Sequence, residues 1–261
     1  MLSSQDKKGL WIMAGVVLAL IAMLAAYRVV VTKAKPGVDL CVGKPIRSTV
    51  ILVDHSETVS DQTREETVTR AMRHIKEVVQ VNERVSVFAI NELGKKSLRP
   101  LVSLCKPPQE GNQLVESPRL IERHFLERFQ RPMQEVLSRP IEGSDQSPIA
   151  QAIADLATSD YLRGTTNHLL VFSDMIEHTG RFSLYKCHAP ERVVAEYRAT
   201  VKGAVERPTF TNTSISVSLI PRRDLRVDGA LLVRCRDTFW PWFFGDNTGP
   251  DAGVRFDLLP G

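Results

Sequence analysis

Several signatures of well-known enzyme and metal-binding classes are missing from this sequence. It has no Gly-x-Ser-x-Gly segment of the kind that carries the nucleophile of many serine hydrolases, and no Gly-rich loop that would cradle phosphates. It also has no Cys-x-x-Cys pair and no Cys/His spacing typical of zinc sites. Internal repeats and low-complexity segments are absent. These absences argue against the common hydrolases, zinc modules and repeat proteins.

A strong excess of charge is also lacking. The 34 Lys and Arg residues are spread among 30 Asp and Glu residues, which gives a formal net charge of +4. No long basic run indicates a nucleic-acid partner, so none is expected. The composition, 43% hydrophobic and 25% charged, is ordinary for a globular protein, and 261 residues fit one large domain with an appendage.

The longest stretch without any charged residue is 9–27. A helix of this length, at about 1.5 Å per residue, spans roughly the hydrocarbon core of a bilayer. Trp11 and Tyr27 stand at its two ends, where amphipathic aromatic residues favour the membrane interface. A cleaved signal peptide is the alternative, but the apolar stretch is long for one, and Arg28 follows a poor cleavage site. We therefore expect a single transmembrane helix.

This expectation divides the chain into a short tail (1–8), a transmembrane anchor (9–31), a linker (32–46) and a folded domain (47–261). Both flanks of the anchor are basic, so the positive-inside rule gives almost no preference between the two orientations. We expect a single-pass protein of the cell inner membrane with its soluble domain in the periplasm. The basic flanks leave a cytoplasmic placement open.

The four cysteines all lie beyond the anchor, at Cys41, Cys105, Cys187 and Cys235. An even count is compatible with two disulfides in an oxidising compartment. It is equally compatible with four buried thiols, because free cysteine packs as a small hydrophobe.

Strand-like and helix-like segments alternate beyond the linker. Residues 48–54 form an apolar, β-branched run without polar alternation, which is typical of a strand covered on both faces. The same reasoning predicts further strands at 84–90, 98–104, 168–174, 213–220 and 254–259. Helices are predicted at 61–80, from Pro118, from Pro132, at 147–156, at 189–205 and at 234–245. This order predicts an α/β fold with a doubly wound, mostly parallel sheet flanked by helices, preceded by a single transmembrane helix.

Polar residues gather where the predicted strands end. Asp54 closes the first strand and is followed by Ser56 and Thr58, Ser147 stands at a helix start, and Asp174 closes a later strand. Ligands of open parallel sheets bind beyond the carboxyl ends of the strands. Carboxylates and hydroxyls are hard oxygen ligands, so these five residues could hold Mg²⁺, or Mn²⁺ in its place.

The three segments resemble those of the von Willebrand factor type A domain. In that family an Asp-x-Ser-x-Ser/Thr motif, a Thr/Ser-Pro helix start and a strand ending in Asp form a metal-ion-dependent adhesion site. The resemblance covers residues 47–261 and carries the metal-ligand role onto Asp54, Ser56, Thr58, Ser147 and Asp174. It implies no catalysis, but metal-dependent binding of a partner protein that supplies an acidic side chain. This chain departs from the pattern at Met175, where the family usually has glycine.

Each part of the pattern also has a simpler structural interpretation. Ser147 before Pro148 could be only a helix N-cap. His55, His168 and His178 are interpreted as surface or structural residues, since imidazole suits softer metals than Mg²⁺. The aromatic residues between 239 and 244 are interpreted as a helix packed into the core, with an exposed interaction patch as the alternative.

Three functions follow from these observations. The first is a membrane-anchored module that binds a partner protein through a Mg-type ion, as a component of a bacterial membrane or envelope complex. The second is a metal-free scaffold subunit with the same fold. The third, least favoured, is a phosphatase-like hydrolase with Asp54 as its nucleophile, although Ser56 stands where such enzymes need a second Asp.

Overall fold

The computed structural model describes residues 4–31, 36–54, 59–90, 99–110, 117–139, 144–201, 206–222 and 229–260. It divides into two compact units, Met1–Gly37 and Val38–Gly261. The predicted ligands Ser56 and Thr58, together with His55, lie outside the described residues.

The first unit contains one helix, α1 (Ser4–Val31), over the segment predicted as an anchor. Its described large apolar side chains are exposed, from Trp11 at 80% to Val17 at 52%. Within the part of the chain that the structure describes, no helix has the combined length and apolarity needed to cross a membrane. The transmembrane anchor therefore stays a prediction from the sequence.

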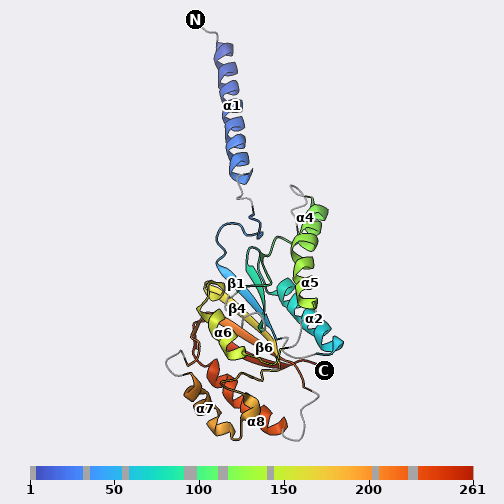
Figure 1. Ribbon diagram of the computed structural model, residues 1–261. Helices are drawn as coiled ribbons and strands as arrows, with labels where there is room; N and C mark the ends of the chain where they lie inside the picture. Colours follow the sequence, from blue (N-terminus) through green and yellow to red (C-terminus); the bar gives the residue numbers. More distant parts are fainter. Residues whose placement is uncertain are drawn as a thin grey trace. The chain divides into compact units, whose positions relative to one another are not determined.

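The second unit is built on a six-stranded sheet (Figure 1). Its strands lie in the order β3-β2-β1-β4-β6-β8, and only β3 is antiparallel to its neighbour. Their bounds are β1 (Arg47–Val53), β2 (Arg84–Ala89), β3 (Val102–Cys105), β4 (Thr166–Ser173), β6 (Thr213–Leu219) and β8 (Gly253–Leu258). A separate parallel pair consists of β5 (Phe210–Thr211) and β7 (Asn247–Thr248). The prediction of a mostly parallel α/β sheet is confirmed.

Helices pack on both faces of this sheet, as Figure 1 shows. One face is covered by α2 (Asp61–Glu77), α4 (Pro118–Phe125), the π-helical turn η1 (Leu126–Gln130) and α5 (Arg131–Ser138). The other is covered by α6 (Ile149–Thr158), α7 (Val193–Thr200) and α8 (Gly229–Phe243). Short 3₁₀ turns are η2 (Asp160–Leu162), η3 (Leu184–Lys186) and η4 (Pro190–Arg192).

Strand β1 explains why the central strands lack polar alternation. Val50 and Leu52 pack in the core under α6 and α8, whereas Ile51 and Val53 pack in the core under α2 and α5. Because successive side chains point to opposite faces, a strand covered on both sides needs apolar residues at every position.

Two details of the helices differ from the sequence predictions. The helix predicted at 61–80 ends at Glu77, and its N-cap is Ser60, because the Ser60 hydroxyl accepts a hydrogen bond from the Thr63 N–H at 3.1 Å. The helical stretches from Pro118 and Pro132 form one continuous run through η1. Pro132 has no N–H to donate to the preceding turn, and the wider π-helical turn directly before it accommodates that loss.

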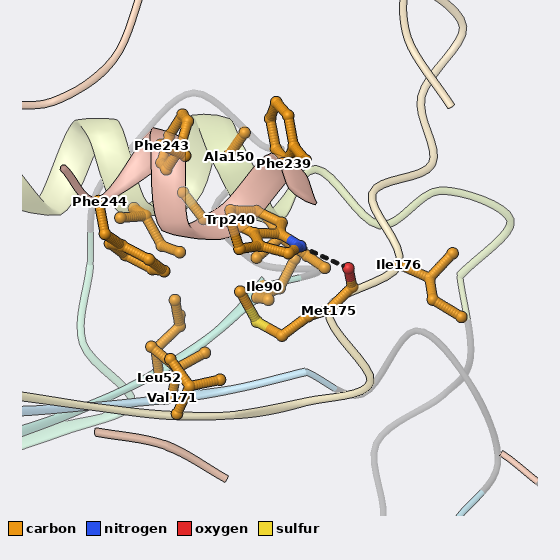
Figure 2. Packing of buried hydrophobic residues seen from close by; sticks show 14 of the residues in the cluster. Leu52, Ile90, Ala150, Val171, Met175, Ile176, Phe239, Trp240, Phe243 and Phe244 are labelled. Carbon is orange, nitrogen blue, oxygen red and sulfur yellow. Dashed lines mark hydrogen bonds between the residues drawn. The ribbon is translucent and has the colours of Figure 1, made fainter. Parts of the chain in front are cut away.

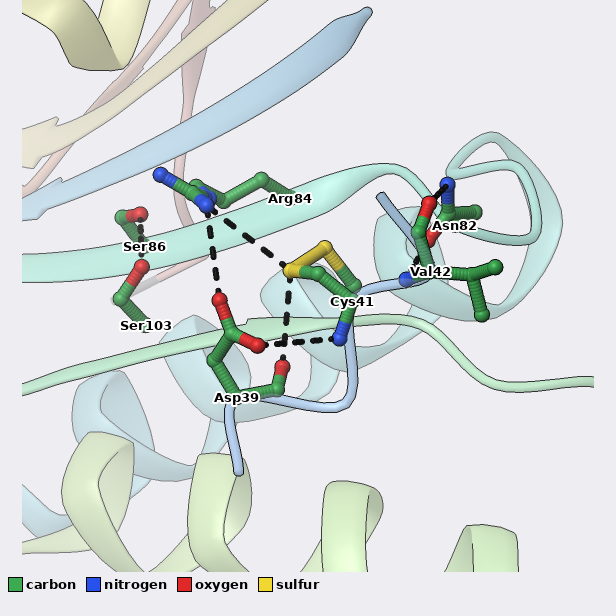
Figure 3. Close-up of a disulfide and its surroundings, with 8 residues drawn as sticks. Asp39, Cys41, Val42, Asn82, Arg84, Ser86 and Ser103 are labelled. Atoms are coloured by element: carbon green, nitrogen blue, oxygen red, sulfur yellow. Dashed lines mark hydrogen bonds and ion pairs between the residues drawn. A yellow bond between two sulfur atoms is a disulfide. The ribbon is translucent and has the colours of Figure 1, made fainter. Parts of the chain in front are cut away.

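Both pairs of cysteines form disulfides, which resolves the alternative left open by the sequence. Cys41 bonds to Cys105 and Cys187 bonds to Cys235. Around the first disulfide, Arg84 of β2 contacts Asp39 at 3.5 Å, and Asn82 exchanges hydrogen bonds with the backbone of Val42 (Figure 3). These contacts hold the start of the second unit, which was predicted to belong to the linker, against β2 and β3.

Candidate functional site

The carboxyl edge of the sheet brings together the predicted site residues that the structure describes. Asp54 directly follows β1 and Asp174 directly follows β4, and these two strands are parallel neighbours. The Asp54 N–H donates to the Phe172 carbonyl at 2.8 Å, which continues the ladder to the strand end. Asp54 and Asp174 are 7% and 9% exposed, so both carboxylates are buried.

Two hydroxyls donate to the same oxygen of Asp54. The Ser147 Oγ donates to Asp54 Oδ2 at 2.9 Å, and the Ser173 Oγ donates to it at 2.8 Å. Ser147 is held in place by backbone hydrogen bonds in both directions with His178. Ser173 was not among the predicted ligands, although its place beside Asp174 at the end of a strand was a usable signal.

Ser147 does not cap helix α6. Pro148 occupies the N-cap position and makes no side-chain hydrogen bond. Glu177 takes over the capping role instead, because its carboxylate accepts the Ala150 N–H at 2.8 Å. Glu177 is 3% exposed, and burial raises the pKa of its carboxyl to about 8. The Ser147 hydroxyl is therefore directed at Asp54, which is what a shared ligand site requires.

Asp174 has two further partners of its own. Its Oδ1 accepts the Ile176 N–H, and its Oδ2 forms an ion pair with Arg222 Nη1, both at 2.8 Å. Burial first, and repulsion from Asp54 second, raise the pKa of Asp174 to about 7 despite these hydrogen bonds. Arg222 lies beyond the end of β6, and nothing in its local sequence pattern marked it as part of the site.

The loop after Asp174 keeps a glycine-like backbone without a glycine. Met175 has a φ of 59°, in the left-handed region that usually favours glycine. Its side chain is fully buried in the core, and its carbonyl accepts the indole N–H of Trp240 at 2.6 Å (Figure 2). Burial and this hydrogen bond therefore offset the strain. The departure from the family pattern at this position leaves the left-handed turn intact.

Aromatic residues at the C-terminal end of α8, and Phe244 directly after it, lie close to this loop, and Trp240 lies next to Met175 (Figure 2). Phe239, Trp240, Phe243 and Phe244 are each at most 1% exposed. The interpretation of this segment as a core helix is confirmed for Phe239, Trp240 and Phe243, and Phe244 is buried directly after the helix.

A pocket of about 310 Å³ adjoins Asp174. Tyr185 and His178 line it with their rings in an edge contact, and the Tyr185 hydroxyl accepts a hydrogen bond from Arg222 at 3.0 Å. Ser183 lies 2.8 Å from the His178 ring nitrogen, so His178 has a structural contact as well as a place on the pocket wall. His168 lies near the start of β4, at the far end of the strand from Asp174.

The described part of the chain contains no group of three or more His, Cys, Asp or Glu residues that could hold a metal ion. The Ser147 and Ser173 hydroxyls contact the Asp54 carboxylate, and Asp174 lines the same pocket as Ser147. Hydroxyl ligands completed by water are compatible with Mg²⁺, which usually keeps several waters. The donor set that the structure describes therefore fits a hard cation, without showing one.

No protein-family model matches the chain, and no curated protein matches its sequence. Among solved structures, it is similar to the crystal structure of the human COPII-coat protein Sec24c, with a TM-score of 0.34 and 12% sequence identity. The match covers 86% of this chain and 31% of that chain. A likeness at this level carries no argument about function. The fold is that of a doubly wound α/β domain. A pair of buried carboxylates lies at the carboxyl edge of its sheet.

Proposed function

We propose that this protein is a membrane-anchored binding module that captures a partner protein at the carboxyl edge of its sheet through a Mg-type cation. The observation that carries the proposal is the convergence of Asp54 and Asp174, both buried and close enough for Asp54 to raise the pKa of Asp174. Two buried carboxylates near each other are stabilised either by a proton on one of them or by a positive charge, and a bound cation would supply that charge.

Asp54, Ser147 and Asp174 would hold the cation, with Ser56 and Thr58 as the further ligands that the family resemblance implies. When bound, Mg²⁺ or Mn²⁺ would supply an open coordination position for an acidic side chain of the partner. The pocket beside Asp174 would receive the residues that flank that side chain. No step of this function requires catalysis.

The disulfides support placement of the folded domain outside the cytoplasm. Disulfides persist in oxidising compartments such as the periplasm and are rare in the cytosol. Together with the uncharged segment 9–27, they favour a single-pass protein of the inner membrane with a periplasmic domain.

A metal-free scaffold is the second candidate, and the ion pair between Arg222 and Asp174 favours it. The guanidinium already supplies one positive charge beside the two carboxylates. In this alternative, Arg222 has the stabilising role that a metal ion has in the first.

The test is thermal unfolding of the full chain in a mild detergent, with and without Mg²⁺ or Mn²⁺. A ligand that binds only the folded state stabilises it by about 2.7 kcal/mol at a hundredfold excess over Kd. We expect a metal-dependent rise in Tm that disappears in Asp54→Ala. Asp160→Ala, which removes an exposed carboxylate on η2, should keep the rise.

The variant Arg222→Gln separates the two candidates. If a metal ion is the proper partner of the carboxylates, removal of the competing guanidinium should increase the metal-dependent rise in Tm. If the domain is a metal-free scaffold, Arg222→Gln should lower Tm to the same extent with and without metal. Absence of any metal effect in both the native chain and Arg222→Gln would refute the metal-dependent proposal.

A further inference from the structure

Strand β8 forms one edge of the six-stranded sheet and is exposed along its whole length. It pairs only with β6 among the described strands, and all six of its residues are exposed. Val254 and Phe256 are 37% exposed and Leu258 is 66% exposed. An exposed edge strand presents unpaired N–H and C=O groups and is a template for pairing with another strand.

The register with β6 shows which backbone groups of β8 face outward. The Leu259 N–H donates to the Leu219 carbonyl at 2.9 Å, so the amides of odd-numbered residues face β6. The direction of the backbone groups alternates along a strand. The N–H and C=O groups of Val254, Phe256 and Leu258 therefore point away from the sheet, toward any strand that adds to this edge.

The side chains of β8 divide between its two faces. Val254, Phe256 and Leu258 share one face, and the Phe256 ring lies 6.3 Å from that of Phe244 on the α8 side. Arg255 and Asp257 share the other face. The strand thus has an apolar row and a row with one positive and one negative charge.

A second copy of the same strand complements both rows in one register. In an antiparallel pair centred on Phe256, Phe256 lies opposite Phe256 of the other copy, and Val254 lies opposite Leu258. Because these residues all direct their N–H and C=O groups outward, they form the hydrogen-bonded pairs between the two strands. Arg255 then faces Asp257 of the other copy, twice by symmetry, in the positions where side chains approach most closely.

Two neighbouring symmetric registers would also place outward N–H and C=O groups opposite each other, but charge repulsion excludes them. A centre at residue 255 places two arginines opposite each other, and a centre at residue 257 places two aspartates opposite each other. Like charges directly opposite on neighbouring strands are destabilising. The sequence Val254-Arg255-Phe256-Asp257-Leu258 thus selects one two-fold arrangement.

We propose that two copies of this chain pair through antiparallel β8 strands about a two-fold axis at Phe256, which joins their sheets into one continuous sheet. The interface is isologous, as in most homodimers, since the same strand contributes from both copies. This inference is independent of the metal-dependent function, because β8 contributes no residue to the site at Asp54 and Asp174.

The test is a charge-reversal series on the full chain in detergent, with the mass followed by sedimentation over a range of concentrations. Arg255→Asp and Asp257→Arg each place like charges opposite each other at two positions, and each should weaken dimerisation by about tenfold or more. The double variant restores two oppositely charged pairs with reversed sign. It should dimerise within about threefold of the native chain.

Arg131→Asp is the matched control, because it makes the same charge change at an exposed position on α5. It should leave dimerisation unchanged. Val254→Pro removes an outward N–H without removing a bond to β6, and it should also weaken the dimer. Thermal unfolding of each variant shows whether the domain remains folded.

Three results would overturn the proposal. The first is a native chain that stays monomeric at protein concentrations up to about 1 mM, the weak end of the affinity scale. The second is a dimer that both single charge reversals leave intact, which would assign association to α1 or another surface. The third is a double variant that dimerises as weakly as the single variants.

Discussion

Replacement of Glu177 by Gln should change how the stability of the protein depends on pH. Glu177 is 3% exposed and caps helix α6 through the Ala150 N–H. Burial raises its pKa from 4.5 to about 8. Between these two values the folded state retains a proton that the unfolded state has lost. Stability therefore falls as pH rises from 4.5 to about 8.

The size of the effect follows from the same values. Each pH unit within the window corresponds to about 1.4 kcal/mol per proton. Between pH 5 and pH 8 the native chain should lose about 3–4 kcal/mol through Glu177. Gln keeps a carbonyl oxygen to accept the Ala150 N–H but does not titrate. Glu177→Gln should therefore be more stable than the native chain at pH 8 and similar to it at pH 5.

The assay is urea unfolding of the full chain at several pH values, followed by the fluorescence of buried Trp240. The quantity of interest is the difference in the free energy of unfolding between variant and native chain. This difference cancels the titration of other groups, including Asp174, His74 and His168. Glu191→Gln, at an exposed position on η4, is the control and should follow the native chain. A difference for Glu177→Gln that stays constant from pH 5 to pH 8 would refute the reasoning.

Three further predictions concern stability, each measured as the free energy of unfolding. Met175→Ala should be less stable than Met175→Gly by about 1 kcal/mol. Both variants lose the buried side chain, but only glycine relieves the strain of the left-handed φ. Equal stability of the two variants would show that the backbone at this position is not strained. Lys106→Met should cost about 2–4 kcal/mol, because the Lys106 ammonium donates to three carbonyls at the end of α2. An unchanged C-terminal end of α2 in hydrogen exchange would count against this role. Replacement of Cys187 and Cys235 by Ser should cost about 4 kcal/mol, because their disulfide closes a 48-residue separation; a similar loss on reduction of the native chain is the check.

The fold could be predicted from the sequence because its signals are local. The apolar run that became β1 has no polar alternation, which indicates a strand buried on both faces, and the structure buries it in that way. The strand β3 and the helix start at Pro118 were also predicted from the sequence. Helix ends were less accurate, since the cap at Ser60 depends on a single hydrogen bond rather than on a repeating pattern.

The candidate site could be predicted only in part. Asp54 and Asp174 were both predicted at the carboxyl edge because each closes a predicted strand and because of the family resemblance, and the structure shows that the two strands are neighbours. Arg222 and Glu177 were missed, because each acts on a segment distant in sequence and carries no repeating signal. Ser147 resembled a helix cap, and only its contact with Asp54 showed a different role.

The sequence by itself determined which segments are strands and helices, and which strand ends carry carboxylates, because hydrophobic periodicity is a property of neighbouring residues. Only the tertiary structure decided how the four cysteines pair, since four cysteines allow three connectivities that the sequence does not distinguish. It also decided that Met175 adopts a glycine-like turn, and that β8 lies at an edge of the described sheet with the amides of its even-numbered residues facing outward. These features depend on distances between segments far apart in the chain, which local patterns do not encode.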